Sequence, residues 1–146
     1  MKIIGYGKLK EEELIKFQNE INFELPDDYK EFLINFNGGV PEERYSTFLV
    51  DSIKQEIGLQ VLYGLNLEDG LDLREWYDEY QDDLLPNCIM IGHGIGFGFI
   101  ILMNSQEKSG VYFWDNTFEL DESSECENVY KISDTFKNFL DIVKKA

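Results

Sequence analysis

The chain has 146 residues, and 13 Lys and Arg residues against 29 Asp and Glu residues give it a formal net charge of −16. A length of roughly 100–200 residues is typical of one domain. A composition that is 43% hydrophobic and 14% aromatic is too apolar for a disordered acidic tail. The charge argues against binding to nucleic acid or to an anionic membrane, because both surfaces are negative, and it favours basic protein partners.

No segment of the chain has the pattern of a signal peptide or of a membrane span. The N-terminal residues contain no sustained apolar run, and the longest apolar stretch is far below the roughly 20 residues of a transmembrane helix. Cys88 and Cys126 lack CxxC spacing, so we expect reduced thiols that are buried or inert, with a reactive thiol or a bridge as the alternative. We therefore expect a cytoplasmic protein with one domain over residues 1–146.

Two helices are predicted in the first quarter of the chain. Apolar residues recur at intervals of three and four in residues 10–21 and again in residues 26–36, as on one face of a helix. Pro26 is favoured at or near the first helical position. Asn37, followed by two glycines, predicts a left-handed end to the second helix.

The rest of the chain alternates between strand and helix patterns. Aromatic and β-branched runs predict strands at residues 45–50, 59–63, 89–91, 97–103, 111–114 and 129–132. A third, acidic helix is predicted over residues 71–84, and a last helix, with Ser133 as its N-cap, through Lys145. Helices at both ends and strands joined by hairpin-length loops predict an α+β domain with a mostly antiparallel sheet and one inserted acidic helix.

Residues 92–98 are rich in glycine, but they do not fit a dinucleotide-binding fingerprint, which needs GxGxxG between a strand and a helix. We expect a β-turn at Gly92-His93-Gly94, followed by a tightly packed strand. His93 is the single histidine of the chain, and no nucleophile motif such as GxSxG accompanies it. The sequence therefore predicts no catalytic residue, no cofactor and no metal site, and His93 is a candidate contact residue on a binding surface.

Most of the negative charge lies in two short segments. Residues 68–83 hold eight acids and one base, and residues 119–127 hold five acids and no base. Acids recur at intervals of three and four along the predicted third helix, which costs about a few tenths of a kcal/mol per like-charged pair. One interpretation is a solvated face; the other is a surface for a basic partner, with Trp76 as an aromatic anchor. The candidate contact residues are Asp69, Asp72, Glu75, Trp76, Glu79, Asp82, Asp83, His93, Asp121, Glu122 and Glu125.

Three segments follow one another in a recognisable order. LPDDYKEFL at residues 25–33 precedes Asn-Gly-Gly at 37–39; Pro86 precedes the glycine-rich segment and GVYFWD at 110–115; and an apolar helix closes the chain at 136–143. In these segments the chain resembles the SUKH superfamily, and within it the subgroup related to the fungal Knr-type cell-wall regulators. The resemblance implies that Asp115 is a turn or contact residue. It also implies a set of fold determinants: Leu25, Pro26, Tyr29, Phe32, Leu33, Gly38, Gly39, Gly110, Tyr112 and Trp114.

The resemblance further implies an α+β fold without a catalytic site. Bacterial members are mostly immunity proteins that bind and neutralise toxins of polymorphic systems, many of them nucleases. We therefore expect a cognate toxin with a basic surface as the partner, bound without chemistry. A protein- or peptide-binding regulatory scaffold is the alternative, and an enzyme is the third class. Members often carry an acidic or polar residue where this chain has His93. The sequence leaves open whether the two acidic segments form one surface.

Overall fold

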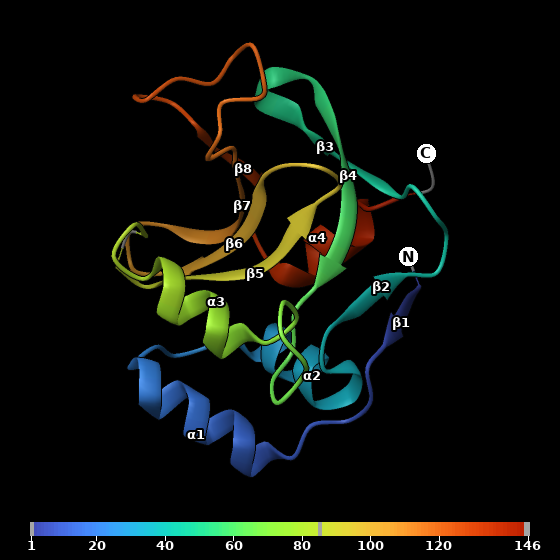
Figure 1. Cartoon of the computed structure of the whole chain (residues 1–146), viewed down its shortest axis with the longest axis vertical. Coiled ribbons are helices and arrows are strands. Elements are labelled where there is room, and N and C mark those ends of the chain that lie inside the picture. Colours follow the sequence, from blue (N-terminus) through green and yellow to red (C-terminus); the bar gives the residue numbers. More distant parts are fainter. Residues whose placement is uncertain (1, 85, 145–146) are drawn as a thin grey trace.

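A twisted antiparallel sheet of eight strands runs through the centre of the molecule (Figure 1). The structure is a computed structural model that describes residues 2–84 and 86–144. The strands are β1 (Ile3–Gly5), β2 (Gly39–Pro41), β3 (Thr47–Val50), β4 (Gln55–Leu62), β5 (Cys88–Gly94), β6 (Phe99–Asn104), β7 (Ser109–Trp114) and β8 (Val129–Ser133). Their order in the sheet is β1-β2-β4-β5-β6-β7-β8, and β3 pairs with the first half of β4. All named pairs are antiparallel, which confirms the predicted fold class.

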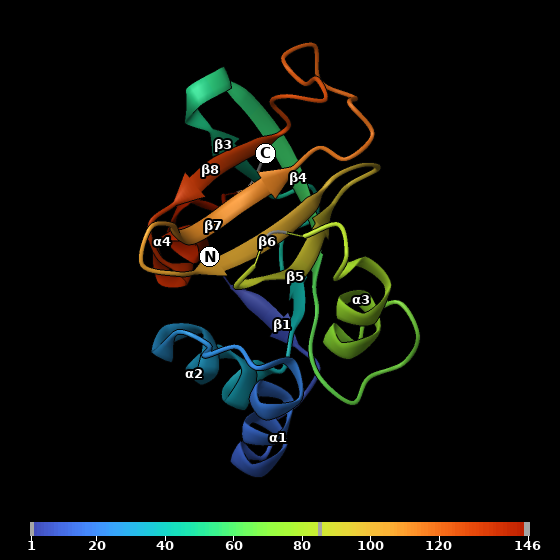
Figure 2. The same ribbon diagram turned by 90° about the vertical axis from the view of Figure 1, so that its left-hand side faces the viewer.

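The helices lie on both sides of this sheet. They are α1 (Glu11–Ile21), α2 (Asp27–Phe36), α3 (Leu73–Tyr80) and α4 (Phe136–Ile142), with a short 3₁₀ helix η1 (Asp51–Ile53) before β4. Figure 2 shows α2 and α4 on one side and α3 alone on the other. Tyr29 and Phe32 of α2 pack against the Phe136 ring of α4, so aromatic contacts join the two helices that cover the first side. The second side is covered by one helix of eight residues, and part of it stays open.

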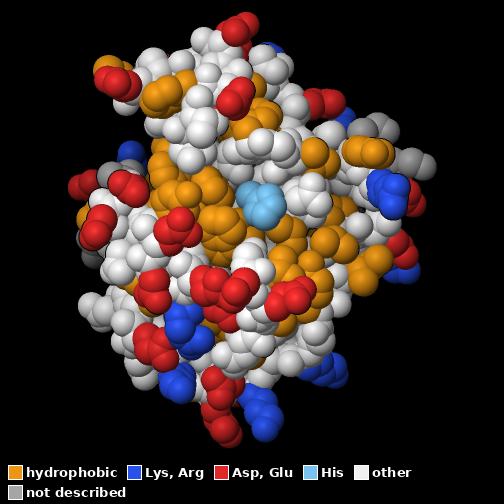
Figure 3. All heavy atoms as spheres, in the orientation of Figure 1, with side chains coloured by type: hydrophobic (Ala, Val, Ile, Leu, Met, Phe, Trp, Pro, Cys, Tyr) orange, Lys and Arg blue, Asp and Glu red, His pale blue; other side chains and the backbone are white. Residues whose placement is uncertain are grey.

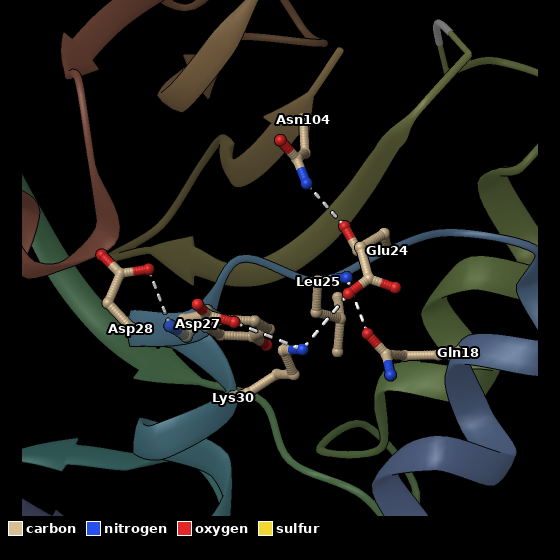
Figure 4. A network of polar contacts seen from close by, with 8 residues as sticks. Gln18, Glu24, Leu25, Asp27, Asp28, Lys30 and Asn104 are labelled. Atoms are coloured by element: carbon tan, nitrogen blue, oxygen red, sulfur yellow. Dashed lines mark hydrogen bonds and ion pairs between the residues drawn. The ribbon is translucent and has the colours of Figure 1, made fainter.

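The loop between α1 and α2 ties three parts of the fold together (Figure 4). The Glu24 carbonyl accepts a hydrogen bond from Asn104 at the end of β6 (2.7 Å), and the next backbone N–H donates to the Gln18 side chain of α1 (2.8 Å). Asp28 then accepts from the backbone N–H of Lys137 in the first turn of α4 (2.9 Å). Within the motif at residues 25–33, the Asp28 side chain thus connects α2 to α4, while apolar residues of the same motif are buried in the core.

Several predicted fold determinants are buried in the core, and one glycine occupies a position that a side chain would not fit. Leu25, Tyr29 and Leu33 are almost fully buried. Gly38 has a φ of +81°, and a side chain there would meet the Leu62 carbonyl oxygen at 2.7 Å. The left-handed end of α2 is confirmed, because Asn37 adopts a φ of 50°. Pro26 is the N-cap of α2, next to the first helical position, as predicted.

The turn predicted at Gly92-His93-Gly94 is wrong. These residues belong to β5 and pair with β4, with Gly92 opposite Leu62 and His93 opposite Val61. A side chain at Gly92 would lie 2.4 Å from the Val61 carbonyl oxygen, so this glycine permits a close approach of two strands. The chain reverses only at residues 95–98, where Gly96 and Gly98 have positive φ angles.

Other element boundaries also differ from those predicted. The third helix spans eight residues, within the predicted 71–84, and the last helix is capped by Thr135, whose side chain accepts from the Asn138 N–H. Ser133 is the last residue of β8, and Lys145 lies outside the described residues. Tyr45 has a φ of 61°, so β3 begins at Thr47. The strands β1 and β2, of three residues each, were not predicted because such short runs show no alternation.

The two cysteines are unbridged and differ in environment. Cys88 is buried, and burial raises the pKa of its thiol to about 12, whereas Cys126 is exposed. The expectation of a buried thiol without a disulfide bridge is therefore confirmed for Cys88. Within residues 2–84 and 86–144, no helix has both the length and the apolar character needed to cross a bilayer.

Candidate partner-binding site

Five aromatic side chains form a continuous cluster between α3 and the open side of the sheet. Trp76 stacks on Tyr63 of the adjoining segment, with ring centroids 5.1 Å apart and planes 12° apart. Phe99 of β6 contacts both Trp76 and Tyr80 at 5.4 Å, and Trp114 of β7 contacts Phe99 and Tyr80 at 5.8 and 5.9 Å. We call these five residues the aromatic cluster. Their rings hold one another in place, so the surface they present is formed before a partner binds.

The first turn of α3 fixes the position of Trp76. Asp72 caps the helix, since one carboxylate oxygen accepts from the Arg74 N–H (2.8 Å) and the other from the Leu67 N–H (3.0 Å). The Trp76 indole N–H donates to the Gly70 carbonyl (2.9 Å). Asp72 is 6% exposed, and its carboxylate is satisfied by the backbone, so its predicted place in the exposed acidic stripe is wrong. Its physical role is to hold the helix that carries the aromatic anchor.

His93 lies beside the aromatic cluster and is hydrogen-bonded to Tyr63, one of its members. Its Nδ1 is 2.6 Å from the Tyr63 hydroxyl, and the ring is half-buried near Trp76. Burial lowers the pKa of the His93 imidazole and raises the pKa of the Tyr63 hydroxyl. At neutral pH the pair is therefore uncharged, and His93 adds no positive charge to this face.

Two hollows open along the aromatic cluster. The first, of about 660 Å³, is lined by Gln60, Trp76, His93, Gly94, Gly96, Phe97, Gly98, Phe99, Asn116, Thr117 and Glu119. The second, of about 480 Å³, is lined by Tyr80, Asp83, Leu84, Cys88, Ile101, Met103, Trp114, Asn116, Asn128 and Val129. Asn116 borders both, so the hollows are neighbours on one face, which we call the α3 face. Figure 3 shows the single histidine near the centre of this face, beside hydrophobic side chains and with acidic side chains around them.

A loop of the chain from Asp115 to Asn128 forms the upper border of the α3 face, above β7 in Figure 1. Asp115 is fully buried, and its carboxylate accepts from the N–H groups of Glu119 (3.0 Å) and Leu120 (2.9 Å) and from the Ser123 hydroxyl (2.6 Å). The Asp115 N–H also donates to the Asn128 carbonyl (2.8 Å), which closes the loop at its base. Asp115 is thus a turn residue, as the resemblance implied. Its hydrogen bonds reach as far as Ser123 and fix the conformation of the loop.

The two acidic segments border the same face. Asp83, from the first segment, lines the second hollow, and Glu119, from the second segment, lines the first hollow. Glu75 and Glu79 are exposed on α3. Also exposed are Asp69, Asp82, Asp121, Glu122 and Glu125. No Lys or Arg is among the described residues that line either hollow. The structure therefore answers what the sequence left open: both segments contribute carboxylates to one aromatic surface.

The negative charge of the first acidic segment, residues 68–83, is not balanced by basic side chains nearby in the described chain. Desolvation and the neighbouring carboxylates of Asp69 and Asp72 raise the pKa of Glu75. The single base of the first segment, Arg74, is turned to another partner, because its Nε lies 2.6 Å from a Glu20 carboxylate oxygen of α1. A cation bound at this border would relieve the repulsion between these acids.

Sequence reasoning identified Trp76, Asp83 and His93 but missed most of the aromatic cluster. Tyr80 was assigned to the apolar face of a helix, Trp114 to the fold, and Phe99 to an unspecified strand. No local pattern distinguishes Phe99, because residues 99–103 are apolar without a break and Ile101 and Met103 are themselves buried in the core. Among the described residues, no group of three or more His, Cys, Asp or Glu side chains is arranged to hold a metal ion. The arrangement presents aromatic faces and carboxylates, which suit the binding of a basic surface.

Comparison with known proteins bears on what this face does. No curated protein and no solved structure gives a match to the chain. The model of the SMI1/KNR4 family (SUKH-1) matches residues 8–142, which include the motif at residues 25–33, the aromatic cluster and the loop held by Asp115. A match over nearly the whole length, on a fold of the expected class, shows that the chain belongs to the SMI1/KNR4 family (SUKH-1).

Proposed function

We propose that the protein is an immunity protein that binds a cognate polymorphic toxin and blocks it by covering its active surface, in the cytoplasm and without chemistry of its own. Membership of the SUKH family supports this role. The observation that carries the proposal is the α3 face, where two acidic segments flank one aromatic surface and no Lys or Arg of the described chain lines its hollows. Such a surface is complementary to a basic protein.

A nuclease is the toxin class that fits this surface best. Enzymes that act on nucleic acid hold the phosphate backbone with Lys and Arg side chains. An acidic protein that covers those side chains competes directly with the substrate. Electrostatic attraction acts at long range but buries no apolar surface. The aromatic cluster supplies that apolar contact area, as buried aromatic residues do at the centres of many interfaces.

Growth rescue and co-purification test the proposal directly. The chain is co-expressed with the product of the adjacent upstream gene, whose toxin domain is expected at its C-terminus. We expect growth to be restored and a complex of the two proteins to be recovered. Continued toxicity with no complex contradicts immunity to that toxin. A complex with a non-toxic partner favours the regulatory scaffold instead.

The binding surface is tested by reversing charge on α3 and just beyond it. The triple variant Glu75→Lys, Glu79→Lys, Asp82→Lys should associate with the toxin at least about tenfold more slowly at low salt and show a flatter salt dependence. The matched control, Glu12→Lys, Glu31→Lys, Asp141→Lys, makes the same change in net charge at exposed positions on α1, α2 and α4. Equal effects of both triples on the association rate would exclude the α3 face as the docking surface.

A further inference from the structure

The first hollow combines aromatic sides with a single carboxylate. Trp76 and Phe99 contact each other at a centroid distance of 5.4 Å with planes 60° apart, so they meet at an angle and form a corner. Glu119 and the neutral His93 also line the hollow. Gly94, Gly96 and Gly98 also line it, and a side chain at Gly96 would meet no other atom within 4 Å.

The second hollow repeats this combination on the other side of Asn116. Tyr80 and Trp114 meet edge to face, with planes 89° apart, and Asp83 is the carboxylate. Each hollow thus holds one carboxylate next to at least two aromatic rings and, among its described lining residues, no basic side chain. Two neighbouring sites with the same chemistry suit a partner segment that carries the same residue type twice.

The molecule already contains one example of this combination at work. The guanidinium carbon of Arg74 lies 5.7 Å from the centre of the Phe17 ring, while Nε of the same side chain pairs with Glu20 at 2.6 Å. An aromatic ring and a carboxylate together hold this arginine. The hollows of the α3 face present the same two components, aromatic rings and a carboxylate.

We propose that the α3 face recognises arginine side chains of its protein partner, with a guanidinium entering each hollow, packed on the aromatic rings and paired with Glu119 or Asp83. This inference rests on the proposed function, because it names the residue type that the same surface selects. Arginine fits better than lysine, since a planar guanidinium stacks on rings and pairs with a carboxylate through two parallel hydrogen bonds. An ammonium group is more strongly hydrated and loses more on entering an apolar hollow.

Short synthetic peptides test the inference on the full chain without a toxin. We compare acetyl-Gly-Arg-Gly-Arg-Gly-amide with the same peptide carrying lysine, by isothermal titration calorimetry at low salt. The two peptides have equal charge, so attraction by the net charge alone gives them equal affinity. We expect the arginine peptide to bind at least about fivefold more tightly, as cation–π contacts of a partly desolvated guanidinium predict. Equal affinities, or no measurable binding of either peptide, overturn the inference.

Matched variants locate the binding. Glu119→Gln and Asp83→Asn each remove a carboxylate of one hollow, and Glu127→Gln and Asp78→Asn remove exposed neighbours that line neither. We expect each hollow variant to weaken the arginine peptide about three- to tenfold and each neighbour variant to weaken it by less than about twofold. Equal losses of affinity in the hollow and neighbour variants overturn the inference, because they show that the peptide responds to the general negative charge of the surface and not to the hollows.

A ring variant separates stacking from charge. Trp76→Phe keeps an aromatic face, whereas Trp76→Leu keeps an apolar side chain without one, and circular dichroism verifies that both variants fold. Trp76 lines the first hollow and not the second. We expect Trp76→Leu to reduce the preference for arginine and Trp76→Phe to retain most of it. An arginine preference that is unchanged in Trp76→Leu overturns the inference.

The inference and the proposed function fail in different ways. If the toxin is neutralised but the peptides show no arginine preference, the function stands and the inference falls. If the arginine preference and its loss in Glu119→Gln are observed but no toxin is neutralised, the recognition chemistry stands and the immunity role falls.

Discussion

The Asp115 carboxylate shows how much of the α3 face depends on one buried side chain. It satisfies two backbone N–H groups and one hydroxyl of the loop that carries the second acidic segment. A buried carboxylate is stable only when its hydrogen-bonding capacity is used in this way. The same bonds turn a run of polar residues into a defined border for the first hollow.

Replacing Asp115 by alanine should therefore destabilise the protein strongly. Three donors lose their acceptor, and hydrogen bonds to charged groups contribute about 1.5–3 kcal/mol each, so we expect a loss of at least about 3 kcal/mol in the free energy of unfolding. Urea denaturation measures the loss. The exposed Asp121→Ala on the same loop is the control and should change stability by less than about 0.5 kcal/mol. A similar small change for Asp115→Ala would contradict the structural role.

The pair of His93 and Tyr63 makes stability depend on pH near neutrality. Because burial lowers the pKa of His93, the unfolded chain binds its proton more readily than the folded one. The stability contributed by the neutral imidazole is fully present above the unfolded pKa of about 6.5 and is lost as the pH falls below it towards the folded pKa.

The His93→Gln variant isolates this effect from the many carboxylates. Between about pH 7.5 and 5.5, we expect wild type to lose more stability than His93→Gln, with a difference of at most about 1.4 kcal/mol per pH unit. Urea denaturation at both pH values gives the four free energies required. Parallel losses in the two proteins would mean that His93 titrates in the folded state as it does in the unfolded chain.

At the scale of elements, α3 is short and depends on its cap. It spans eight residues, and Asp72 joins its first turn to the preceding loop. A helix of this length is marginal alone and needs tertiary contacts. Here those contacts are the rings of Trp76 and Tyr80 against the sheet, so cap and aromatic cluster stabilise each other.

Removal of the cap by Asp72→Ala should loosen α3 and leave the sheet intact. We expect a loss of about 1–2 kcal/mol in stability, as for other N-cap deletions, with faster amide hydrogen exchange over Leu73–Tyr80. Asp69→Ala, three residues earlier and exposed, is the control. Uniformly faster exchange across β5 to β7 would indicate that the cap supports the whole fold instead.

The elements also show what the sequence could predict and why the rest escaped it. Apolar patterns at helical spacing located the four helices, and aromatic and β-branched runs bounded by turn residues located six of the eight strands. The prediction failed at Gly92-His93-Gly94, where a pattern typical of a turn reflects the close approach of β4, a contact between distant residues. The acids Asp83 and Glu119 meet around one face only through the sheet order, which no local pattern encodes.

At the scale of the whole molecule, the net charge of −16 is expected to destabilise the folded state. Most of that charge lies in the two acidic segments that border the α3 face. Like charges three and four residues apart destabilise a helix. Repulsion over the whole surface also opposes the compact state, and dissolved salt screens it. A surface suited to a basic partner is thus expected to lower the stability of the free protein.

Neutralising the face should consequently stabilise the free protein. We expect the triple variant Glu75→Gln, Glu79→Gln, Asp82→Asn to be more stable than wild type at low salt, and to lose most of this gain at about 0.3 M NaCl. The control triple Glu12→Gln, Glu31→Gln, Asp141→Asn changes net charge equally and should gain less, because its sites lie on three different helices. Urea denaturation at two salt concentrations makes the comparison, and equal gains would show that only total charge matters.

The position of the two tryptophans has a practical consequence. Trp76 and Trp114 are the only tryptophans of the chain, and both line a hollow of the α3 face. Their ultraviolet emission therefore comes entirely from that surface, and none of it from the opposite side of the sheet. A partner free of tryptophan that covers the face changes the polarity around both indoles, so wavelength and intensity report occupancy without any attached dye. Intrinsic tryptophan fluorescence can therefore measure binding at the surface where a partner is expected.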